Sequence, residues 1–483
     1  MIVGVDIGTQ SLKVVITDDN LLVLGEATMA YQPSFPKPGW AEQDPSLWEN
    51  ALSPTIARAL DLANAKPGEI VAIGIGGQLD GCIGVDGQGL PIHPCLTWMD
   101  RRAEKQIAGL PADDILKRTG IILDASHMAA KICWLKDNFA NGNIGQLFHV
   151  PVSYIVHRLT GVAVMDHAHA STSMLYSLTD RAFDSTLLDM FGIKKHELPA
   201  IANATEIAGA LTSEGEKLTG LPEGIPVAVG TGDDFSTLLG AGVVQPGRLT
   251  CVLGTAEVVG ALHSSPVIDE GRLVETHAYV GNTFFIENPG WLSGGALEWF
   301  RETFRLVDFA ELDALAEAIP PGSEGLTFLP ALSGTMAPEW IASAKGCFYG
   351  LTPAHGNGHM ARAVLEGTAF AMRDVIERLN EMAVEIRSIL LLGGGAKSRT
   401  WAKIRADMTG LPVEVPNITD TAPIGSAMLA AVAAGIQPDL LSAAKLVGDV
   451  SKTIMPDRQA KPAYDEAYGN YRRLFNTLRP LFS

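Results

Sequence analysis

Two stretches of the chain show the same alternation of apolar runs and glycine turns. The first is IVGVDIGTQSLKVVITD, which starts at Ile2, and the second is LTCVLGTAEVVGAL, which starts at Leu249. An apolar run, a Gly-Thr turn and a second apolar run are typical of two strands joined by a tight turn. The recurrence of this pattern predicts an internal repeat.

A second pair of apolar runs follows in the same order. IVAIGIGGQ, from Ile70, and ILLLGGGAK, from Ile389, each predict a buried strand that ends in a glycine turn. We therefore predict an α/β protein of two related domains, residues 1–245 and 246–483. In duplicated α/β halves, ligands bind where strand ends and glycine turns converge, so we expect a ligand cleft between the domains.

Helical periodicity is clear in the stretch that follows residue 44. Trp48, Leu52, Ile56 and Leu60 are four residues apart, which predicts a helix with one buried face. Pro54 lies inside this stretch. Because proline has no backbone N–H to donate and its ring crowds the preceding turn, we expect it to kink or shorten the helix.

Length and composition indicate a globular protein with more than one domain. The chain has 483 residues, of which 47% are hydrophobic and 19% charged, and 50 are glycine. No apolar run approaches the ~18 residues that would cross a bilayer, so we expect no membrane partner. The net charge of −18 and the lack of a Lys/Arg cluster argue against a nucleic-acid partner.

The cysteines and the first residues predict a cytoplasmic protein. The five cysteines lie far apart and form no CxxC pair, so neither a disulfide framework nor a zinc site is indicated. The opening MIVGVDIGTQ is typical of a strand and a turn, and it lacks the basic and apolar regions of a signal peptide.

The first glycine turn is a candidate phosphate site. In DIGTQSLK, the small residues allow backbone N–H groups and the Thr9 hydroxyl to approach an anion. Asp6 at the end of the preceding strand is placed to hold Mg²⁺ through water. A copy of the turn at Gly254 and Thr255 favours a pair of hairpins that grip a polyphosphate. No GxxxxGK[ST] motif is present, which excludes a P-loop.

Two further motifs each have a functional and a purely structural interpretation. The glycines 393–395 lie between a predicted strand and a predicted helix, where a flat ring or a phosphate can rest on the backbone. A tight strand-to-helix connection explains them equally well. In VAVGTGDDFSTLLGAG, the acids Asp233 and Asp234 serve as a base, as a specificity element or as helix caps.

Over nearly its whole length, the chain resembles the FGGY carbohydrate kinases, and within them most closely the xylulokinase branch. The segment GCFYGLTPAHGNGHMARAVLEG, from Gly346, fits the second signature of that family. The other matching segments are DIGTQSLK, PGWAEQDPSLW, GQLDG, TWMDRR, SHMAAKICWLKDN, TGLPEGIPVAVGTGDD, LGT and LLGGGAKSRTWAKIRADMTGLPV. Met128 in the first signature departs from the Pro, Ser or Thr that is usual there.

The resemblance implies two duplicated actin-like, ribonuclease-H-like domains with a nucleotide and sugar cleft between them. It also implies that ATP and Mg²⁺ are used to phosphorylate a sugar or polyol hydroxyl. Related kinases are often dimers, so a homodimer is an expectation, although the sequence itself does not reveal the oligomeric state. It assigns Asp233 as the catalytic base. The nucleotide and metal positions that it implies are Asp6 and Asp233 for metal, and Gly8, Thr9, Gln10, Lys13, Gly254, Thr255, Gly394, Gly395 and Arg399 for ATP.

The sugar site departs from the family pattern. The resemblance places it at Gln78, Leu79, Asp80, Trp98, Asp100 and Asp234. Xylulokinases carry Met-His where this chain has Leu79-Asp80, and glycerol kinases carry Arg-Glu, so the missing arginine argues against glycerol. Asp80 is explained equally well as a turn residue before Gly81, and Trp98 as a core residue.

Several substrates therefore stay open. We expect a pentulose, with D-xylulose first, and ribulose, erythritol or ribitol as alternatives. An actin-like ATPase that phosphorylates no sugar is the alternative from another class.

Two acidic departures carry expectations of their own. Asp234 replaces the Asn or Gln that is usual beside the base, and its charge should raise the proton affinity of Asp233. Glu257 stands where relatives have glycine, and it adds an acid near the second phosphate hairpin. This acid would alter metal or nucleotide affinity, but we favour a harmless subfamily feature.

Overall fold

The computed structural model describes residues 1–139, 147–418 and 420–482. These residues form two compact units that do not follow the chain order strictly. Unit 1 comprises Met1–Val244, His277–Phe284 and Asp420–Asp449, and unit 2 comprises Gln245–Thr276, Phe285–Thr419 and Val450–Ser483. Across the described ranges, every helix is too short or too polar to traverse a lipid bilayer.

Unit 1 is built on a mixed sheet with the strand order β13-β14-β5-β1-β2-β3, and β15 also pairs with β5. The strands are β1 (Ile2–Ile7), β2 (Ser11–Thr17), β3 (Val23–Ala30), β5 (Ala72–Gly77), β13 (Ile207–Ala210), β14 (Pro226–Ala228) and β15 (Thr231–Gly232). β1 runs antiparallel to β2 and parallel to β5, and β5 runs parallel to β14 and β15.

Unit 2 repeats this central pairing in the order β18-β19-β17-β16-β22-β23-β24. Its strands are β16 (Gly247–Leu253), β17 (Ala256–His263), β18 (Glu275–Ala278), β19 (Phe284–Leu292), β22 (Ile386–Leu392), β23 (Val413–Pro416) and β24 (Val450–Ile454). β16 pairs antiparallel with β17 and parallel with β22, just as β1 pairs with β2 and β5. The internal repeat predicted from the sequence is therefore confirmed.

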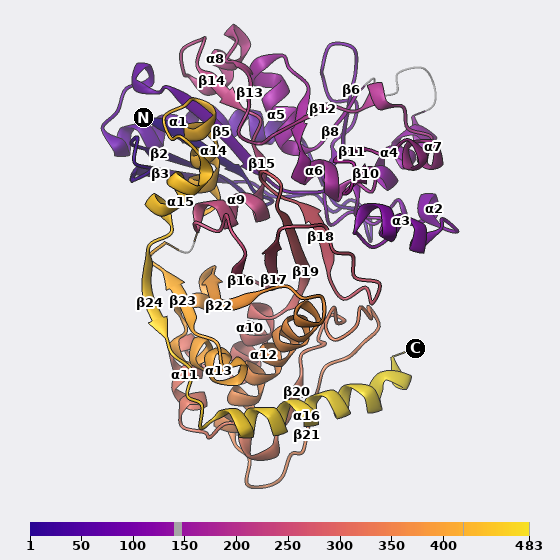
Figure 1. The fold of residues 1–483 in the computed structure, drawn as a ribbon, viewed down its shortest axis with the longest axis vertical. Helices are drawn as coiled ribbons and strands as arrows, with labels where there is room; N and C mark the ends of the chain where they lie inside the picture. Colours follow the sequence, from indigo (N-terminus) through magenta and orange to yellow (C-terminus); the bar gives the residue numbers. More distant parts are fainter. Residues whose placement is uncertain (140–146, 419, 483) are drawn as a thin grey trace. The chain divides into compact units, whose positions relative to one another are not determined.

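Helices flank the sheet of each unit (Figure 1). Unit 1 contains α1 (Ser46–Ala63), α2 (Glu104–Ile107), α3 (Ala112–Thr119), α4 (Met128–Asn138), α5 (Pro151–Thr160), α6 (His167–Thr172), α7 (Ser185–Phe191), α8 (Ser213–Thr219), α9 (Asp233–Gly240), α14 (Ala422–Ala433) and α15 (Leu440–Val447). Unit 2 contains α10 (Gly294–Thr303), α11 (Phe309–Glu317), α12 (Asn357–Glu381), α13 (Arg399–Thr409) and α16 (Lys461–Leu478).

Short strands complete the two units. They are β4 (Glu42–Gln43), β6 (Ile83–Val85), β7 (Cys95–Leu96), β8 (Leu147–His149), β9 (Val164–Asp166), β10 (Tyr176–Ser177), β11 (Ala182–Phe183), β12 (Ala200–Ala202), β20 (Thr327–Leu329) and β21 (Cys347–Tyr349). Those before Val244 pair with one another in unit 1, and β20 pairs with β21 in unit 2.

A late segment of the chain, 420–449, belongs to unit 1. Its helix α14 packs on β1 and β5, and Figure 1 shows it among the strands of that unit. Glycines permit this approach, because a Cβ on Gly74 would lie 1.8 Å from the Ser426 carbonyl oxygen. The predicted division at residue 245 placed this segment with the second domain, whereas its apolar face is covered by the first sheet.

Helix α1 runs from Ser46 to Ala63 without interruption at Pro54, so the expected shortening is wrong. Its buried face contains the four predicted residues Trp48, Leu52, Ile56 and Leu60. Pro54 and Asn50, whose carbonyl loses its helical partner, are both on the exposed face. Water can hydrate that carbonyl, so the proline is tolerated there.

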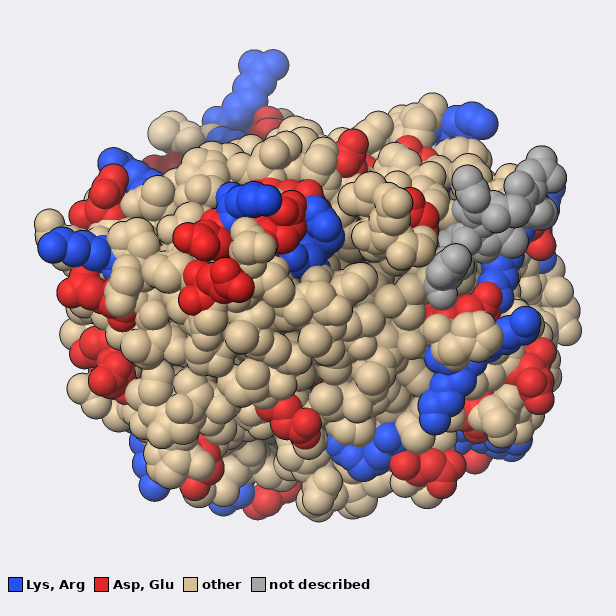
Figure 2. Space-filling view, turned by 90° about the horizontal axis from the view of Figure 1, so that it is seen from above, with Lys and Arg blue, Asp and Glu red and all other residues tan. Residues whose placement is uncertain are grey.

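Charged side chains are mixed on the surface. On the face drawn in Figure 2, Lys and Arg side chains lie singly or beside Asp and Glu, and they form no continuous basic patch. This face therefore offers no electrostatic track for a nucleic-acid backbone.

Candidate active site

Two acids converge at one end of the first sheet. Asp6 is paired with Lys13 across β1 and β2, and with Gly76 across β1 and β5. On the other side of β5, β15 places Thr231 opposite Gly76 and leads directly into α9, which begins at Asp233. The strand β5, which ends in Gly76 and Gly77, therefore lies between the two acids, and neither of its terminal residues carries a side chain.

Burial and mutual repulsion favour the neutral forms of both acids. Burial and the neighbouring Asp233 raise the pKa of Asp6 to about 7, although Lys13 opposes this shift. Burial and the neighbouring Asp234 raise the pKa of Asp233 to about 7. The predicted effect of Asp234 on the proton affinity of Asp233 is thereby confirmed.

Asp6 has an unsatisfied oxygen. Its side chain is only 4% exposed, and its Oδ1 atom finds no hydrogen-bond donor within the described ranges. Lys13, its cross-strand neighbour, donates instead to Asp420 at 2.6 Å. Asp420 precedes α14 and was not predicted from the sequence, because only the packing of α14 on β1 brings it here.

The first hairpin is held by three side chains. Tyr31 donates its hydroxyl to the Gly8 carbonyl at 2.7 Å, and Gln43 donates to the Thr9 carbonyl at 2.6 Å. Trp98 donates its indole N–H to the Thr9 hydroxyl oxygen at 3.0 Å. The Thr9 hydroxyl therefore keeps its own hydrogen for an acceptor such as a phosphate oxygen.

The second hairpin is held by the backbone. Gly254 donates its N–H to the Ala256 carbonyl, and the Thr255 carbonyl accepts from the N–H groups of Ser293 and Gly295. Gly254 and Thr255 are exposed at the tip. The two hairpins thus expose equivalent Gly-Thr tips in their respective units.

Glu257 lies beneath the second hairpin and does not add free charge to it. Its carboxylate is completely buried and accepts two hydrogen bonds from Arg405, at 2.5 and 2.8 Å. Ser293 donates a third at 2.6 Å. The Arg405 guanidinium neutralises the carboxylate, which favours the harmless interpretation and removes the reason to expect altered metal or nucleotide affinity.

The glycine triplet divides into packing and open positions. Gly393 has a φ of 76°, and a Cβ on Gly395 would lie 2.8 Å from the Trp401 ring. A Cβ on Gly394 would meet nothing within 4 Å. Gly394 is thus the member of the triplet whose backbone is open to a ligand, and Arg399 begins the following helix with an exposed side chain.

Asp80 adopts a left-handed backbone conformation, with φ 53°, beside the first sheet. Its Oδ2 atom lies 3.3 Å from His127 Nδ1, and Lys131 donates to its backbone carbonyl at 2.5 Å. Burial opposes ionisation, but His127 and Lys131 outweigh it and lower the pKa of Asp80. Asp80 is thus an anion whose Oδ1 atom has no hydrogen-bond donor within the described ranges.

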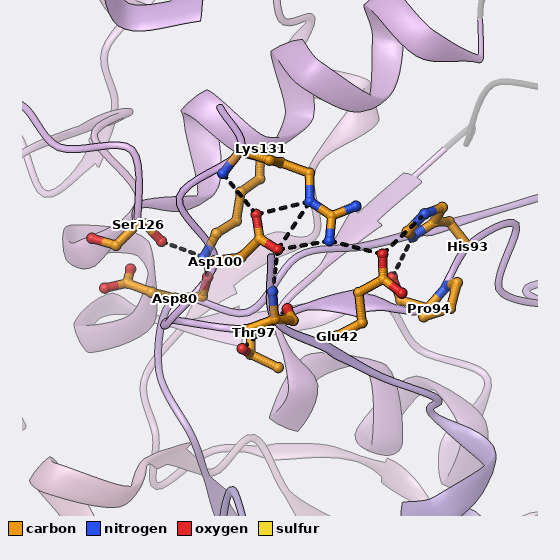
Figure 3. Close-up of polar contacts among 10 residues, drawn as sticks. Glu42, Asp80, His93, Pro94, Thr97, Asp100, Ser126 and Lys131 are labelled. Carbon is orange, nitrogen blue, oxygen red and sulfur yellow. Dashed lines mark hydrogen bonds and ion pairs between the residues drawn. The ribbon is translucent and has the colours of Figure 1, made fainter. Parts of the chain in front are cut away.

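Asp100 is a structural anion rather than an open ligand. Figure 3 shows its carboxylate surrounded by donors. It accepts from the Ala41 N–H at 2.7 Å and from three N–H groups of Arg102, and its side chain is fully buried. Arg102 also bridges to Glu42 at 2.7 Å. Asp100 therefore has no accessible oxygen for the predicted contact with a substrate. We assign it instead to holding the turn that carries Trp98.

The other predicted sugar residues are placed differently from one another. Gln78 is fully buried and donates to Gln43, which holds the first hairpin. Leu79 lies over Gly232, since a Cβ there would be 2.1 Å from Leu79 Cδ2. Trp98 is 48% exposed, so it is not a core residue.

His127 and His169 were not predicted as site residues. Both are buried, at 5% and 1% exposure. His127 lies within SHMAAKICWLKDN, and a polar residue at the start of a helix with a buried face was a usable signal. His169 lies in HAHAST, where nothing in the local pattern distinguishes it from a surface histidine.

The chain matches a family in both halves. The model of the FGGY family of carbohydrate kinases, N-terminal domain, matches residues 1–240, and that of the C-terminal domain matches residues 249–434. The chain therefore belongs to the FGGY family of carbohydrate kinases. It is a phosphotransferase with an alcohol group as acceptor, and its fold is that of the actin-like sugar kinases.

Individual relatives differ in their substrates. A glycerol kinase of Acaryochloris marina is 32% identical over 93% of both chains. The xylulose kinase of Escherichia coli is 29% identical over the full length of both chains. The crystal structure of a ligand-bound xylulose kinase from Lactobacillus acidophilus has a TM-score of 0.92 at 27% identity, covering 99% of this chain and 98% of that one.

Proposed function

We propose that this kinase transfers the γ-phosphoryl group of ATP to a hydroxyl of a pentulose, with D-xylulose as the leading substrate. The observation that carries the proposal is Asp233, a half-buried carboxylate at the start of α9 whose pKa is raised to about 7. A sugar hydroxyl is a poor nucleophile, and a carboxylate of raised proton affinity is suited to accept its proton during attack on phosphorus.

Asp6 and Asp233 would hold Mg²⁺. The described residues contain no group of three or more His, Cys, Asp or Glu side chains arranged for a metal. Mg²⁺, however, is typically bound by one or two carboxylates together with phosphates and water. The unpartnered Asp6 Oδ1 and the raised pKa values of both acids fit a site that binds a cation. Bound Mg²⁺ would neutralise charge on the phosphates.

The two hairpins would hold the phosphates. The Gly8-Thr9-Gln10 tip with Lys13 in unit 1, and Gly254 and Thr255 in unit 2, present small residues and donors to an anion. Gly394, Gly395 and Arg399 would hold the adenosine, and the adenine ring would rest on the open backbone of Gly394.

Leu79, Asp80, Trp98 and Asp234 would recognise the sugar. Leu79 has no hydrogen-bond donor to offer a glycerol hydroxyl, whereas Asp80 and Asp234 accept hydroxyl hydrogens. Asp80 is ionised and has a free oxygen, which suits a polyhydroxylated ketose. Another ketose or a polyol is the second candidate, and it is favoured by the glycerol kinases among the relatives. The cytoplasmic location and the homodimer stay predictions.

The test is phosphoryl transfer by the purified protein with ATP and Mg²⁺. Each of D-xylulose, D-ribulose, erythritol, ribitol and glycerol is supplied in turn, and both ADP release and the phosphorylated product are measured. We expect sugar-dependent ADP release, fastest with D-xylulose, and Asp233→Asn should abolish transfer while ATP still binds. The loss should be about 10²-fold or more, as for other positioned bases.

The control is nucleotide binding by Asp233→Asn, which separates loss of the base from loss of fold. ATP turnover without a phosphorylated product would support the actin-like ATPase instead. Activity of the Asp233→Asn variant within about tenfold of the wild type would move the base to another residue.

A further inference from the structure

A buried acid–histidine pair lies beside the strand that leads to Asp233. Asp166 ends β9 and caps α6, where it accepts the backbone N–H groups of Ala168 and His169. Its Oδ1 atom also lies 2.8 Å from His169 Nδ1, and its Oδ2 atom accepts the Thr231 hydroxyl at 2.6 Å. Because Thr231 is two residues before Asp233, this hydrogen bond fixes the pair to the strand that positions the base.

The contact with Asp166 decides which ring nitrogen of His169 is free. An ionised carboxylate only accepts hydrogen bonds, so His169 Nδ1 carries the hydrogen. In the neutral ring, Nε2 then presents a lone pair. The structural work of the side chain, which is to bind Asp166, is done entirely by Nδ1.

Nε2 is the part of this side chain without a structural purpose. His169 is 1% exposed, and its Nε2 atom has no hydrogen-bond partner within the described ranges. A buried acceptor without a donor costs stability and needs an explanation. His149 Nε2 also lacks a partner within the described ranges, so what points to a substrate hydroxyl is the position of His169 beside the strand that leads to Asp233. His169 lies within electrostatic range of Asp233, and the hydrogen bond from Thr231 to Asp166 ties its partner to the strand that leads to Asp233.

We infer that His169 Nε2 accepts a hydrogen bond from the substrate hydroxyl on the carbon next to the phosphorylated one. The inference rests on the proposed sugar kinase function. Asp233 takes the reacting hydroxyl, and neighbouring hydroxyls of a sugar lie close together, so a second acceptor near the base meets the next hydroxyl. His169 is in this role a specificity-determining residue that reads the configuration of that carbon.

Four pentuloses form pairs that isolate this carbon. If the terminal hydroxyl at C5 receives the phosphate, the neighbouring carbon is C4. D-xylulose and L-ribulose differ only at C4, and so do D-ribulose and L-xylulose. The measured quantity is the ratio of kcat/KM within each pair, and NMR of the products establishes which hydroxyl is phosphorylated.

The decisive variant is His169→Asn. The asparagine amide takes the place of Nδ1 and keeps the partner of Asp166, but it has no atom at the position of Nε2. We expect the wild type to prefer one configuration at C4 by about tenfold or more. The sugar with the other configuration would leave the buried Nε2 without a hydrogen-bond donor, and binding sites discriminate strongly against such substrates. In His169→Asn the ratio should fall toward one. His169→Gln, whose amide reaches the Nε2 position, should recover part of the preference.

His149→Gln is the matched control. His149 is also buried in unit 1, where its Nδ1 atom lies 2.7 Å from Ser153 Oγ and its ring stacks on His157. This variant should change stability and leave the C4 ratio unchanged. A general loss of packing therefore cannot imitate the expected result.

Several results would overturn the inference. They are a wild type without preference at C4, a His169→Asn ratio within twofold of the wild type, an equal loss on both members of a pair, and a His169→Asn chain that does not fold. The last would make His169 a structural residue. Absence of transfer to all four sugars by the wild type would instead contradict the proposed function itself.

Discussion

At the scale of single residues, Asp233 and Asp234 are adjacent acids with different consequences. Asp233 begins α9 and is half-buried, and desolvation together with the charge of Asp234 raises its pKa. The Asp234 N–H also donates to Asp233 Oδ1 at 3.1 Å, which orients the carboxylate. Asp233 is therefore the acid of raised proton affinity, and Asp234 is the neighbour whose charge keeps that affinity high.

Replacing Asp234 should shift the pH dependence of the reaction. A base acts only when deprotonated, so activity should rise with pH through the pKa of Asp233. Asp234→Asn removes the charge that raises this pKa, and the acidic limb of the kcat/KM profile should move to lower pH. The measurement is kcat/KM between pH 5 and 8, in saturating Mg²⁺.

Asp420→Asn is the control for that profile. Asp420 is bound to Lys13 and acts on Asp6 rather than directly on Asp233. Its removal should move the limb less than Asp234→Asn does. An Asp234→Asn profile that stays in place, or moves to higher pH, would show that Asp234 does not set the proton affinity of the base.

At the scale of elements, the two Gly-Thr hairpins are held by different means. The β1–β2 tip is held by the side chain of Tyr31, which follows β3, and by side chains from β4 and from the turn with Trp98. The tip of the β16–β17 hairpin is held by backbone hydrogen bonds, and beneath it the Glu257–Arg405 pair joins β17 to α13. Removing one partner of a fully buried ion pair is costly, because the charge of the other partner stays buried without a counter-charge.

Glu257→Gln should therefore destabilise unit 2. We expect the free energy of unfolding to fall by about 3–5 kcal/mol, as when one partner of a buried pair is removed. Urea unfolding followed by circular dichroism measures the change. The double variant Glu257→Met with Arg405→Met should recover much of the loss, because it buries no charge.

Lys217→Gln is the reference for this experiment. Lys217 forms an ion pair with Glu214, and its side chain is 73% exposed. Exposed pairs contribute about 0–1 kcal/mol, so this variant should unfold close to the wild type. A Glu257→Gln chain as stable as Lys217→Gln would mean that the buried pair does not hold the hairpin.

At the scale of the whole molecule, unit 1 is completed by a segment from the far end of the chain. α14 covers β1 and β5, and it brings Asp420 to Lys13. The contact depends on glycines in the strands, since a Cβ on Gly74 would overlap the Ser426 carbonyl. The first domain is therefore not formed by the first half of the sequence alone.

Gly74→Ala should weaken unit 1 by pushing α14 away from the sheet. Overpacking of this kind costs about 1–3 kcal/mol, which urea unfolding of the full chain can resolve. Gly68→Ala is the control, because a Cβ there meets nothing within 4 Å. If both variants unfold at the same urea concentration, α14 does not pack on β5 as closely as described.

Features that follow from neighbouring residues along the chain could be predicted from the sequence. Apolar runs and glycine turns predicted both hairpins, the strands β5 and β22, and the repeat, because strand and turn formation follow from neighbouring residues. The sequence also placed Asp6 at the end of a strand. The helical spacing of Trp48 and Leu52 predicted the buried face of α1.

The contacts between the site residues and distant parts of the chain could not be predicted from the sequence and came from the folded structure. Arg405 cancels the charge of Glu257, Arg102 occupies Asp100, and α14 joins the first sheet. Likewise, Asp166 binds Nδ1 of His169, and the Thr231 hydroxyl ties this pair to the strand before Asp233. Charge and hydrogen bonding act through space over a few ångströms, whereas the pattern along a chain records only which residues are neighbours in order.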